Sequence, residues 1–546
     1  MKKSMIISGI LLVLMVAGYS ISSNANTGEG SIEFKKIVIP TERGDLSGFL
    51  YTPKVNLTNP IPAALLTHGI SNSKETLTGI AIELSSRGLV CLCLDLYGHG
   101  LSEGQLGNND PSIGVISGVE YLRSLDYVDE TRLALIGHSL GAGAVRAASN
   151  QPGVWANVFI GGGMNAGNRD ISGILNSTLP RNLLFAVGSN DILFDIESLK
   201  TEIAPVFGSE SPIEQGKVYG DKIQGTGRKL TISSTIHLLE PVDGSIVSSV
   251  AEWVFTSLKP EDTFDEDSFL YSQRDIGNLF TVIAFTLLVY PLSDMAWNSH
   301  RVKTQRGSTK NDQLLMLFWS VLGLILFIPA MALGAIVPFP PQVFGSSLAW
   351  WLLVTGIIGL SVLKMKKRVK SNSEIIEKFQ MRGVFLGVVL FCILYLIVYG
   401  FENYYGIGLM YVIPFFRSLS LQRIPMVPAY IPFFLTYFTA EGFYLHSKRN
   451  YTDNIELLKP SIIKTSPYIL LLTLQYGGMY LLNVRLIPGI IGFFLEFLWG
   501  IVPIFLITTL WSTWLRKTTG NITAGIVLNT LVVSWIAATT FPFGVF

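Results

Sequence analysis

Cysteine and charge are both scarce in this sequence of 546 residues. Only three cysteines occur, and 14% of the residues are charged against 49% that are hydrophobic. Cys91 and Cys93 alternate in one apolar run, where they point to the same face of a strand too far apart to be bridged, so we expect no disulfide framework. With Cys392, they are expected to be core residues. The net charge of +1 argues against nucleic-acid binding, which requires a large basic excess.

The scarcity of charge accompanies a mean hydropathy of +0.45, which is higher than a soluble chain carries. From Ile276 onward we expect about eight membrane-spanning helices, because each apolar stretch is near the roughly 20 residues that a hydrocarbon core demands. The stretches are 276–297, 313–337, 347–364, 383–401, 424–445, 466–484, 487–510 and 521–541. The region 404–423 is apolar but short, and is expected to be re-entrant or interfacial. Residues 276–546 are therefore predicted to form an all-α transmembrane domain.

The N-terminus has the pattern of a targeting segment. Lys2 and Lys3 precede the apolar run 5–17, and Ser22-Ser23-Asn24-Ala25 follows it. This order is typical of a secretory signal peptide or a signal-anchor over residues 1–25. Cleavage after Ala25 stays open. No cysteine follows the run at a lipid-attachment position, so we do not expect a lipoprotein.

Basic residues indicate the orientation in the membrane, because they fall in alternate loops of the predicted bundle. They are Arg301, Lys303, Arg306, Lys310, Lys364, Lys366, Lys367, Arg368, Lys370, Lys448, Arg449, Arg516 and Lys517. The positive-inside rule places these loops in the cytoplasm. Residues 32–258 precede the first span of this bundle and are joined to it by an acidic linker, 259–275. We therefore expect a multi-pass protein of the cell membrane whose N-terminal domain is extracytoplasmic.

The pentapeptide Gly137-His138-Ser139-Leu140-Gly141 follows the apolar run 133–136 and leads into a segment of small residues. A Gly-x-Ser-x-Gly between a strand and a helix indicates a nucleophile elbow. The turn is so tight that a Cβ two residues to either side of the serine would collide with its neighbours. Ser139 is therefore the predicted nucleophile.

An acid and a base follow the serine in the order that a catalytic triad on this architecture requires. Asp191 comes after the apolar run 182–187, which reads as a buried parallel strand, and is the predicted acid. Asp195 and Glu197 remain alternatives for that role. His237 follows the next expected strand, 229–234, and is the predicted base, because the other histidines of the region sit inside earlier loop motifs.

These groups together predict acyl chemistry. A neutral imidazole takes the Ser139 proton, the carboxylate stabilises the imidazolium, and the alkoxide attacks an acyl carbon. The oxyanion needs donors, for which we predict the backbone NH groups of Leu140 and Ile70. His68 is expected to orient its loop.

The segment from Leu65 to Gly104 carries a more specific signal. His68-Gly69, the loop 95–102 (DLYGHGLS) and the serine pentapeptide occur in the order of three motif loops. In this respect the chain resembles the α/β-hydrolase family and, within it, the serine aminopeptidase and monoacylglycerol-lipase-like group. The resemblance covers residues 32–258. It implies a mostly parallel sheet with helices on both faces, and no metal or organic cofactor.

The sequence departs from that family pattern in two places. His237 lacks the glycine that often precedes the family's histidine. The cap usually inserted after the strand 156–160 is reduced to a short stretch ending near Arg181, which leaves the pocket without its usual lid.

Ionisable residues also occur in the predicted membrane half. For Glu496, in FFLEFLWG, a functional polar pocket and a structural hydrogen bond are equally favoured, because a carboxylate in a bilayer usually faces an interior. Asp294 and Glu441 are expected to be snorkelled or interfacial. Arg417 and Arg423 are expected at the external surface, in contact with lipid headgroups.

The leading hypothesis is a membrane-embedded serine hydrolase that cleaves an ester, thioester or amide of a lipid or amphiphilic acyl substrate outside the cytoplasm. An acyltransferase that uses the same acyl-enzyme is one alternative. A transporter or signalling protein with a non-catalytic, hydrolase-like binding domain is the other, because eight spans are far more than an anchor needs. The expected partners are this small-molecule or lipid-like substrate and the bilayer, without nucleic acid.

Overall fold

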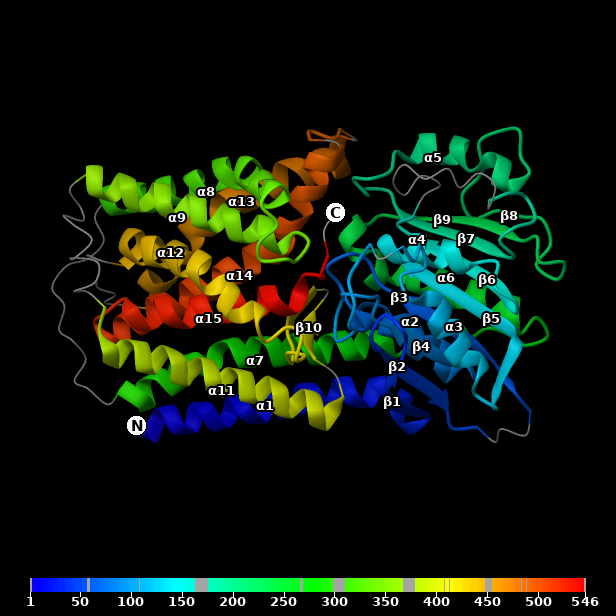
Figure 1. The fold of residues 1–546 in the computed structure, drawn as a ribbon, viewed down its shortest axis with the longest axis horizontal. Helices are drawn as coiled ribbons and strands as arrows, with labels where there is room; N and C mark the ends of the chain where they lie inside the picture. Colours follow the sequence, from blue (N-terminus) through cyan, green and yellow to red (C-terminus); the bar gives the residue numbers. More distant parts are fainter. Residues whose placement is uncertain are drawn as a thin grey trace.

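The computed structural model describes residues 2–544, apart from residues 56–58, 108, 163–174, 266–268, 298–309, 367–378, 407, 412, 447–453, 483 and 488. An α/β domain forms one end of the elongated molecule, and long helices form the other (Figure 1). The predicted fold class, an α/β-hydrolase fold followed by an all-helical region, is confirmed by this division and by the strand order below.

One nine-stranded sheet organises the α/β domain, in the order β1-β2-β4-β3-β5-β6-β7-β9-β8. The strands are β1 (Ile32–Ile39), β2 (Leu46–Pro53), β3 (Ile61–Thr67), β4 (Val90–Leu94), β5 (Val128–His138), β6 (Val154–Ile160), β7 (Leu183–Gly188), β8 (Val218–Tyr219) and β9 (Arg228–Ser233). β2 pairs antiparallel with both β1 and β4, and β8 pairs antiparallel with β9. All other pairings are parallel, so the carboxyl ends of β3, β5, β7 and β9 meet at one edge.

Helices cover both faces of the sheet. They are α2 (Thr78–Ser86), α3 (Val115–Arg123), α4 (Leu140–Ala148), α5 (Ile196–Glu202) and α6 (Gly244–Leu258). β4 shows why two helical layers form, since every residue of this strand is buried. Its Cys91 and Cys93 pack in one core with residues of α2 and α6, while Leu92 and Leu94 pack in the other with residues of α3 and α4. The expectation of core cysteines holds for these two but is wrong for Cys392, which is exposed on the bundle surface.

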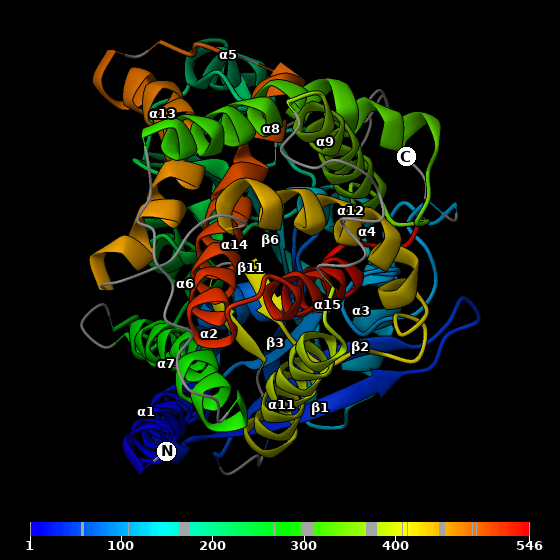
Figure 2. The same ribbon diagram turned by 90° about the vertical axis from the view of Figure 1, so that its left-hand side faces the viewer.

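The helical half contains a helix in each of the eight predicted stretches. Its members are α7 (Tyr271–Trp297), α8 (Lys310–Ile336), α9 (Gly345–Met365), α11 (Met381–Tyr405), α12 (Met426–His446), α13 (Asn454–Leu482), α14 (Gly489–Thr519) and α15 (Thr523–Thr540). Between α11 and α12, the short strands β10 (Leu409–Tyr411) and β11 (Ile413–Phe416) form a hairpin. α14 and α15 run through the middle of the bundle, with α7 and α11 on one side and α8 and α9 on the other (Figure 2).

Within the described residues, seven helices are long and apolar enough to cross a membrane: α1 (Lys2–Asn26), α7, α8, α9, α11, α14 and α15. α1 packs alongside α7, where a Cβ on Gly18 would lie 2.7 Å from the Gly277 carbonyl oxygen. Ser22 at this contact donates hydrogen bonds to the Arg274 carbonyl, at 2.8 Å, and to Asn278 Oδ1, at 3.1 Å. Small residues thus allow the two backbones to approach closely.

The α/β domain and the bundle meet through buried polar contacts. Arg423 Nε donates to the Gly100 carbonyl at 2.7 Å, and its Nη2 donates to the Gly98 carbonyl at 2.8 Å. Its Nη1 donates to the Ala538 and Phe541 carbonyls at the end of α15. Because the loop before α12 passes between the two halves, the expectation that Arg417 and Arg423 contact lipid headgroups is wrong; they are 2% and 1% exposed.

Glu441 also departs from its predicted environment. It is 2% exposed and forms a buried ion pair with Lys464 of α13, so its carboxylate does not snorkel toward solvent. The lysine supplies the countercharge that makes burial of this carboxylate tolerable. Asp294 is half-buried and accepts a hydrogen bond from Thr518 Oγ1 at 3.2 Å.

Candidate active site

Ser139 occupies the sharp turn between β5 and α4. Its backbone has φ 52° and ψ −113°, a conformation that an L-residue adopts only under strong local constraint. A Cβ on Gly137 would lie 2.2 Å from the Gly141 carbonyl oxygen, and one on Gly141 would lie 2.6 Å from the carbonyl oxygens of Thr67 and His68. Only glycine fits at both positions, as the pentapeptide predicts.

The three predicted catalytic side chains meet at the carboxyl edge of the sheet. His237 Nε2 lies 2.9 Å from Ser139 Oγ, and His237 Nδ1 lies 2.7 Å from Asp191 Oδ2. Asp191 follows β7, and His237 follows β9 in the 3₁₀ turn His237–Val242. Asp191 also accepts the Leu193 NH at 2.7 Å, which fixes its loop. The arrangement forms a continuous hydrogen-bonded chain from acid to imidazole to hydroxyl.

The two alternative acids lie outside this chain. Asp195 is the N-cap of α5 and accepts the Ser198 NH at 3.0 Å. Glu197 is exposed and pairs with Lys200 on the same helix. The structure therefore brings Asp191, rather than either alternative, to the histidine.

Glu240 is a site residue that the sequence reasoning missed. Its Oε2 lies 3.5 Å from His237 Nδ1 and 3.3 Å from His138 Nε2, and its Oε1 accepts the Gly188 NH at 2.6 Å. Burial, reinforced by the charge of Asp191, raises the pKa of Glu240 well above its ordinary value. The signal was the spacing His-x-x-Glu, which places both side chains on one side of a short helical turn.

The charges around His237 also act on its proton affinity. Burial alone would lower the pKa of the imidazole, but the surrounding carboxylates, with Asp191 contributing most, together outweigh it and raise the pKa to about 10. The acid thus stabilises the imidazolium that proton transfer from Ser139 would create.

A second buried network holds the loops beside the serine. Asp95 accepts hydrogen bonds from the Lys74 backbone NH at 2.7 Å and the Leu101 NH at 2.8 Å, and its Oδ2 lies 2.5 Å from Lys74 Nζ. Burial opposes ionisation, but the Lys74 ammonium holds the pKa of Asp95 down at about 2. His68 Nε2 accepts the Leu96 NH at 3.2 Å, in keeping with its expected role in orienting its loop. These contacts fix the loop that carries Ile70.

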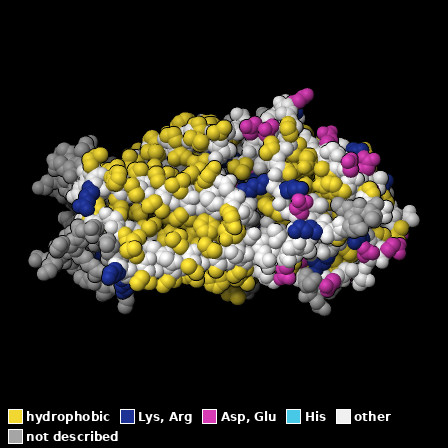
Figure 3. Space-filling model, turned by 90° about the horizontal axis from the view of Figure 1, so that it is seen from below, with side chains coloured by type: hydrophobic (Ala, Val, Ile, Leu, Met, Phe, Trp, Pro, Cys, Tyr) yellow, Lys and Arg dark blue, Asp and Glu magenta, His cyan; other side chains and the backbone are white. Residues whose placement is uncertain are grey.

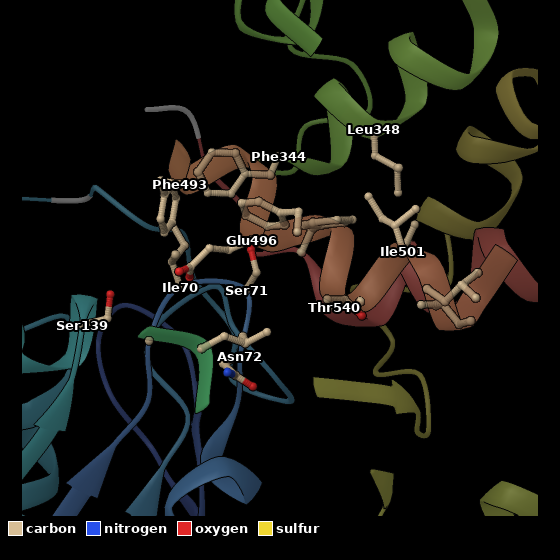
Figure 4. A pocket seen from close by; sticks show the side chains of 18 of the residues that line it. Ile70, Ser71, Asn72, Ser139, Phe344, Leu348, Phe493, Glu496, Ile501 and Thr540 are labelled. Carbon is tan, nitrogen blue, oxygen red and sulfur yellow. The ribbon is translucent and has the colours of Figure 1, made fainter. Parts of the chain in front are cut away.

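An apolar cavity of about 120 Å³ opens from Ser139 and runs between the α/β domain and the bundle. Ile70, the predicted oxyanion donor after β3, lines it together with the serine (Figure 4). Leu140, the other predicted donor, begins α4 directly after the serine. Of the stretch expected to hold the reduced cap, residues 163–174 lie outside the described residues.

The helices form the far wall of this cavity. Their lining residues are Met331 of α8, Leu348 of α9, Phe493, Glu496, Phe497, Gly500, Ile501 and Ile504 of α14, Val533, Ile536, Ala537 and Thr540 of α15, and the neighbouring Phe344 and Phe541. Glu496 is 4% exposed and accepts a hydrogen bond from the Tyr476 hydroxyl at 3.3 Å. The structure contains both features that the two interpretations of Glu496 expect: a hydrogen bond to a neighbouring helix, from Tyr476 of α13, and a place in the wall of the cavity that opens from Ser139.

His138, His237 and Glu240 each offer a ligand atom, all within 4.8 Å of one another, so this cluster has the residue types of a metal site. Both ring nitrogens of His237, however, take part in the hydrogen bonds to Ser139 and Asp191. A metal ion at this position would compete with those bonds.

Known proteins resemble this chain only over part of its length. No family model matches the chain. The quorum-quenching protein AidA of Acinetobacter baumannii is 31% identical over 108 residues, which are 19% of this chain and 35% of that protein. The chain thus covers about a third of this curated relative.

Solved structures resemble the chain at lower identity. An esterase of Pyrococcus furiosus is 19% identical, with a TM-score of 0.32 over 42% of this chain and 96% of its own. A hypothetical protein of Pseudomonas aeruginosa is 16% identical, with a TM-score of 0.32, over 42% of this chain and 94% of its own. A cold-adapted esterase from an Arctic intertidal metagenomic library is 14% identical, with a TM-score of 0.32, over 42% of this chain and 95% of its own.

Proposed function

We propose that this protein is a membrane-embedded serine hydrolase that cleaves acyl esters of lipids or amphiphiles outside the cytoplasm. The observation that carries the proposal is the hydroxyl of Ser139, 2.9 Å from His237 Nε2 and at the mouth of an apolar cavity that continues into the bundle. The serine aminopeptidase and monoacylglycerol-lipase-like group is the part of the α/β-hydrolase family to which we assign residues 32–258.

The proposed mechanism uses the three side chains as nucleophile, base and acid. His237 Nε2 takes the Ser139 proton while Oγ attacks the ester carbonyl, and the NH groups of Leu140 and Ile70 stabilise the oxyanion. The imidazolium, held by Asp191, then protonates the leaving alcohol as the ester C–O bond breaks. Water deprotonated by His237 attacks the acyl-enzyme, which releases the carboxylic acid and restores Ser139.

The shape of the cavity supports an acyl substrate with a long apolar tail. On α14, Phe493, Phe497, Ile501 and Ile504 line it at helical spacing, so the apolar wall extends about 16 Å along the helix at 1.5 Å per residue. α14 and α15 thereby supply a wall next to the serine, on the side where the sequence predicts only a reduced cap. The acyl chain of a substrate bound there would leave water or lipid and pack closely against apolar side chains.

Charge distribution supports the proposed orientation. On the face that Figure 3 shows, hydrophobic side chains spread over much of the bundle, and Lys and Arg side chains lie at its end far from the α/β domain. Lys364, Arg516 and Lys517 lie at this end. By the positive-inside rule it is cytoplasmic, which puts Ser139 on the other side. Most of the other basic residues used for this prediction lie outside the described residues, namely Arg301, Lys303, Arg306, Lys367, Arg368, Lys370, Lys448 and Arg449.

The test is hydrolysis of para-nitrophenyl esters of graded chain length by the purified full chain in detergent. We expect turnover that rises with chain length and is lost in Ser139→Ala and His237→Ala, while Ser198→Ala on the exposed α5 keeps it. Equal turnover by the wild type and Ser139→Ala would overturn the proposal. Product analysis with an added alcohol separates hydrolysis from acyl transfer, since the latter yields a new ester instead of a free acid.

A further inference from the structure

Among the polar side chains that line the cavity and that the proposed chemistry does not use, two face each other across it. Glu496 reaches it from α14, and Ser71 reaches it from the loop after β3. Figure 4 shows the Ser71 hydroxyl pointing from the α/β domain toward α14, with Glu496 between Ser139 and the apolar residues Leu348 and Ile501. The two groups therefore face the same part of the cavity from opposite walls.

Neither group is satisfied in the way that buried polar side chains usually are. Ser71 is 7% exposed, and its hydroxyl oxygen has no hydrogen-bond partner among the described residues. Glu496 accepts one hydrogen bond, from Tyr476, and no described lysine or arginine forms an ion pair with it. A buried carboxylate and a buried hydroxyl without such partners have a high affinity for a donor that enters the cavity.

Their position along the cavity says which part of a substrate they meet. On α14, Glu496 lies near the end next to Ser139, and Ile504 lies eight residues, or about 12 Å, further along. An acyl chain that runs from the carbonyl at Ser139 toward Ile504 passes Glu496 within its first few carbons.

We propose that Glu496 and Ser71 select acyl substrates that carry an O–H or N–H donor close to the ester carbonyl, either a hydroxyl or an ammonium group. The carboxylate of Glu496 accepts from either group. Ser71 donates to a hydroxyl oxygen or accepts from an ammonium. An acyl chain without a donor leaves both side chains unpaired, and a site built around such groups rejects the analogue that lacks the partner. The inference rests on the proposed hydrolase function and names the substrate class of that same site.

The test compares para-nitrophenyl decanoate with its β-hydroxy and α-amino derivatives, using the full chain in detergent. The readout is the ratio of kcat/KM for each derivative to that for the plain ester, so that a general loss of activity cancels. We expect the wild type to favour one derivative about tenfold or more, and the favoured derivative tells a hydroxyl from an ammonium. The ratio is expected to fall toward one in Glu496→Leu and in Ser71→Ala.

One variant guards against misfolding, and another serves as a control. Ser71→Ala changes only the α/β domain, so it remains informative if Glu496→Leu does not fold. Glu197→Gln on the exposed α5 is the matched control and is expected to keep the wild-type ratio. A wild-type ratio near one, or a ratio that both cavity variants leave unchanged, overturns the inference. The absence of hydrolysis of all three esters defeats the proposed function instead, and the inference falls with it.

Discussion

Nδ1 of His237 lies 2.7 Å from Oδ2 of Asp191, with both side chains buried. The carboxylate raises the pKa of the imidazole against the effect of burial. Because only the neutral imidazole can take the serine proton, a raised pKa means that activity increases with pH as the imidazolium loses its proton.

Asp191→Asn is therefore expected to change both the size and the pH dependence of activity. The change lowers kcat by about 10⁴-fold, because an amide no longer holds the imidazole in the tautomer that accepts the serine proton and no longer stabilises the imidazolium. The pKa of His237 falls with it, so the acid limb of the kcat/KM profile shifts to lower pH. The measurement is a pH–rate profile of both proteins. An acid limb at the same pH in both would show that Asp191 does not act on His237.

Burial and the adjacent Asp191 carboxylate raise the pKa of Glu240 well above its ordinary value, which favours the neutral acid. Glu240→Gln imitates the neutral acid and keeps an acceptor for the Gly188 NH, so its kcat/KM at pH 7 should stay close to that of the wild type. Glu240→Leu leaves that buried NH unpaired and should lower the free energy of unfolding by about 1 to 3 kcal/mol. Kinetics and thermal unfolding check the pair. A collapse of kcat/KM in the glutamine variant, which keeps the size of the side chain and the acceptor, would mean that the carboxylate charge is needed.

Ile501→Trp should block the far part of the cavity. Turnover of the decanoate ester is expected to fall about tenfold or more relative to the butyrate ester, because a longer acyl chain no longer fits. Leu506→Trp, at a 40% exposed position of the same helix, is the matched control and should leave this chain-length profile unchanged. Identical profiles for Ile501→Trp and the wild type would show that the acyl chain binds elsewhere.

The sequence predicted the sheet and the three catalytic candidates because both depend on local pattern. The glycines around Ser139 and the apolar runs before Asp191 and His237 encode a turn and two strand ends, and parallel strands bring those ends to one edge. Glu240 escaped notice because its spacing from His237 brings the two side chains together only if the segment folds into a helical turn, which the sequence alone did not indicate. The helical wall of the cavity depends on how two separately patterned regions dock, which no local spacing specifies.

Arg423, which lies where the α/β domain meets the bundle, also could not be placed from the sequence alone. Beside an apolar helix, Arg423 suggested lipid headgroups, yet its guanidinium donates to four backbone carbonyls from both halves.

Arg423→Met should lower the free energy of unfolding by about 3 kcal/mol, and Arg423→Lys should not restore it, because an ammonium lacks the planar fork. Thermal unfolding measures the effect. Lys217→Met, in an exposed ion pair, is the control and is expected to change stability by about 0.5 kcal/mol or less. Equal stability of Arg423→Met and the wild type would mean that these contacts do not hold the halves together.

The central claim is that Ser139 is a nucleophile activated by His237. Labelling of the detergent-solubilised full chain with a fluorophosphonate probe tests it most directly, because the probe reacts only with an activated serine. The account predicts that the wild type labels and that Ser139→Ala and His237→Ala do not. A folded wild type that fails to label, or a Ser139→Ala protein that labels as strongly, would contradict it.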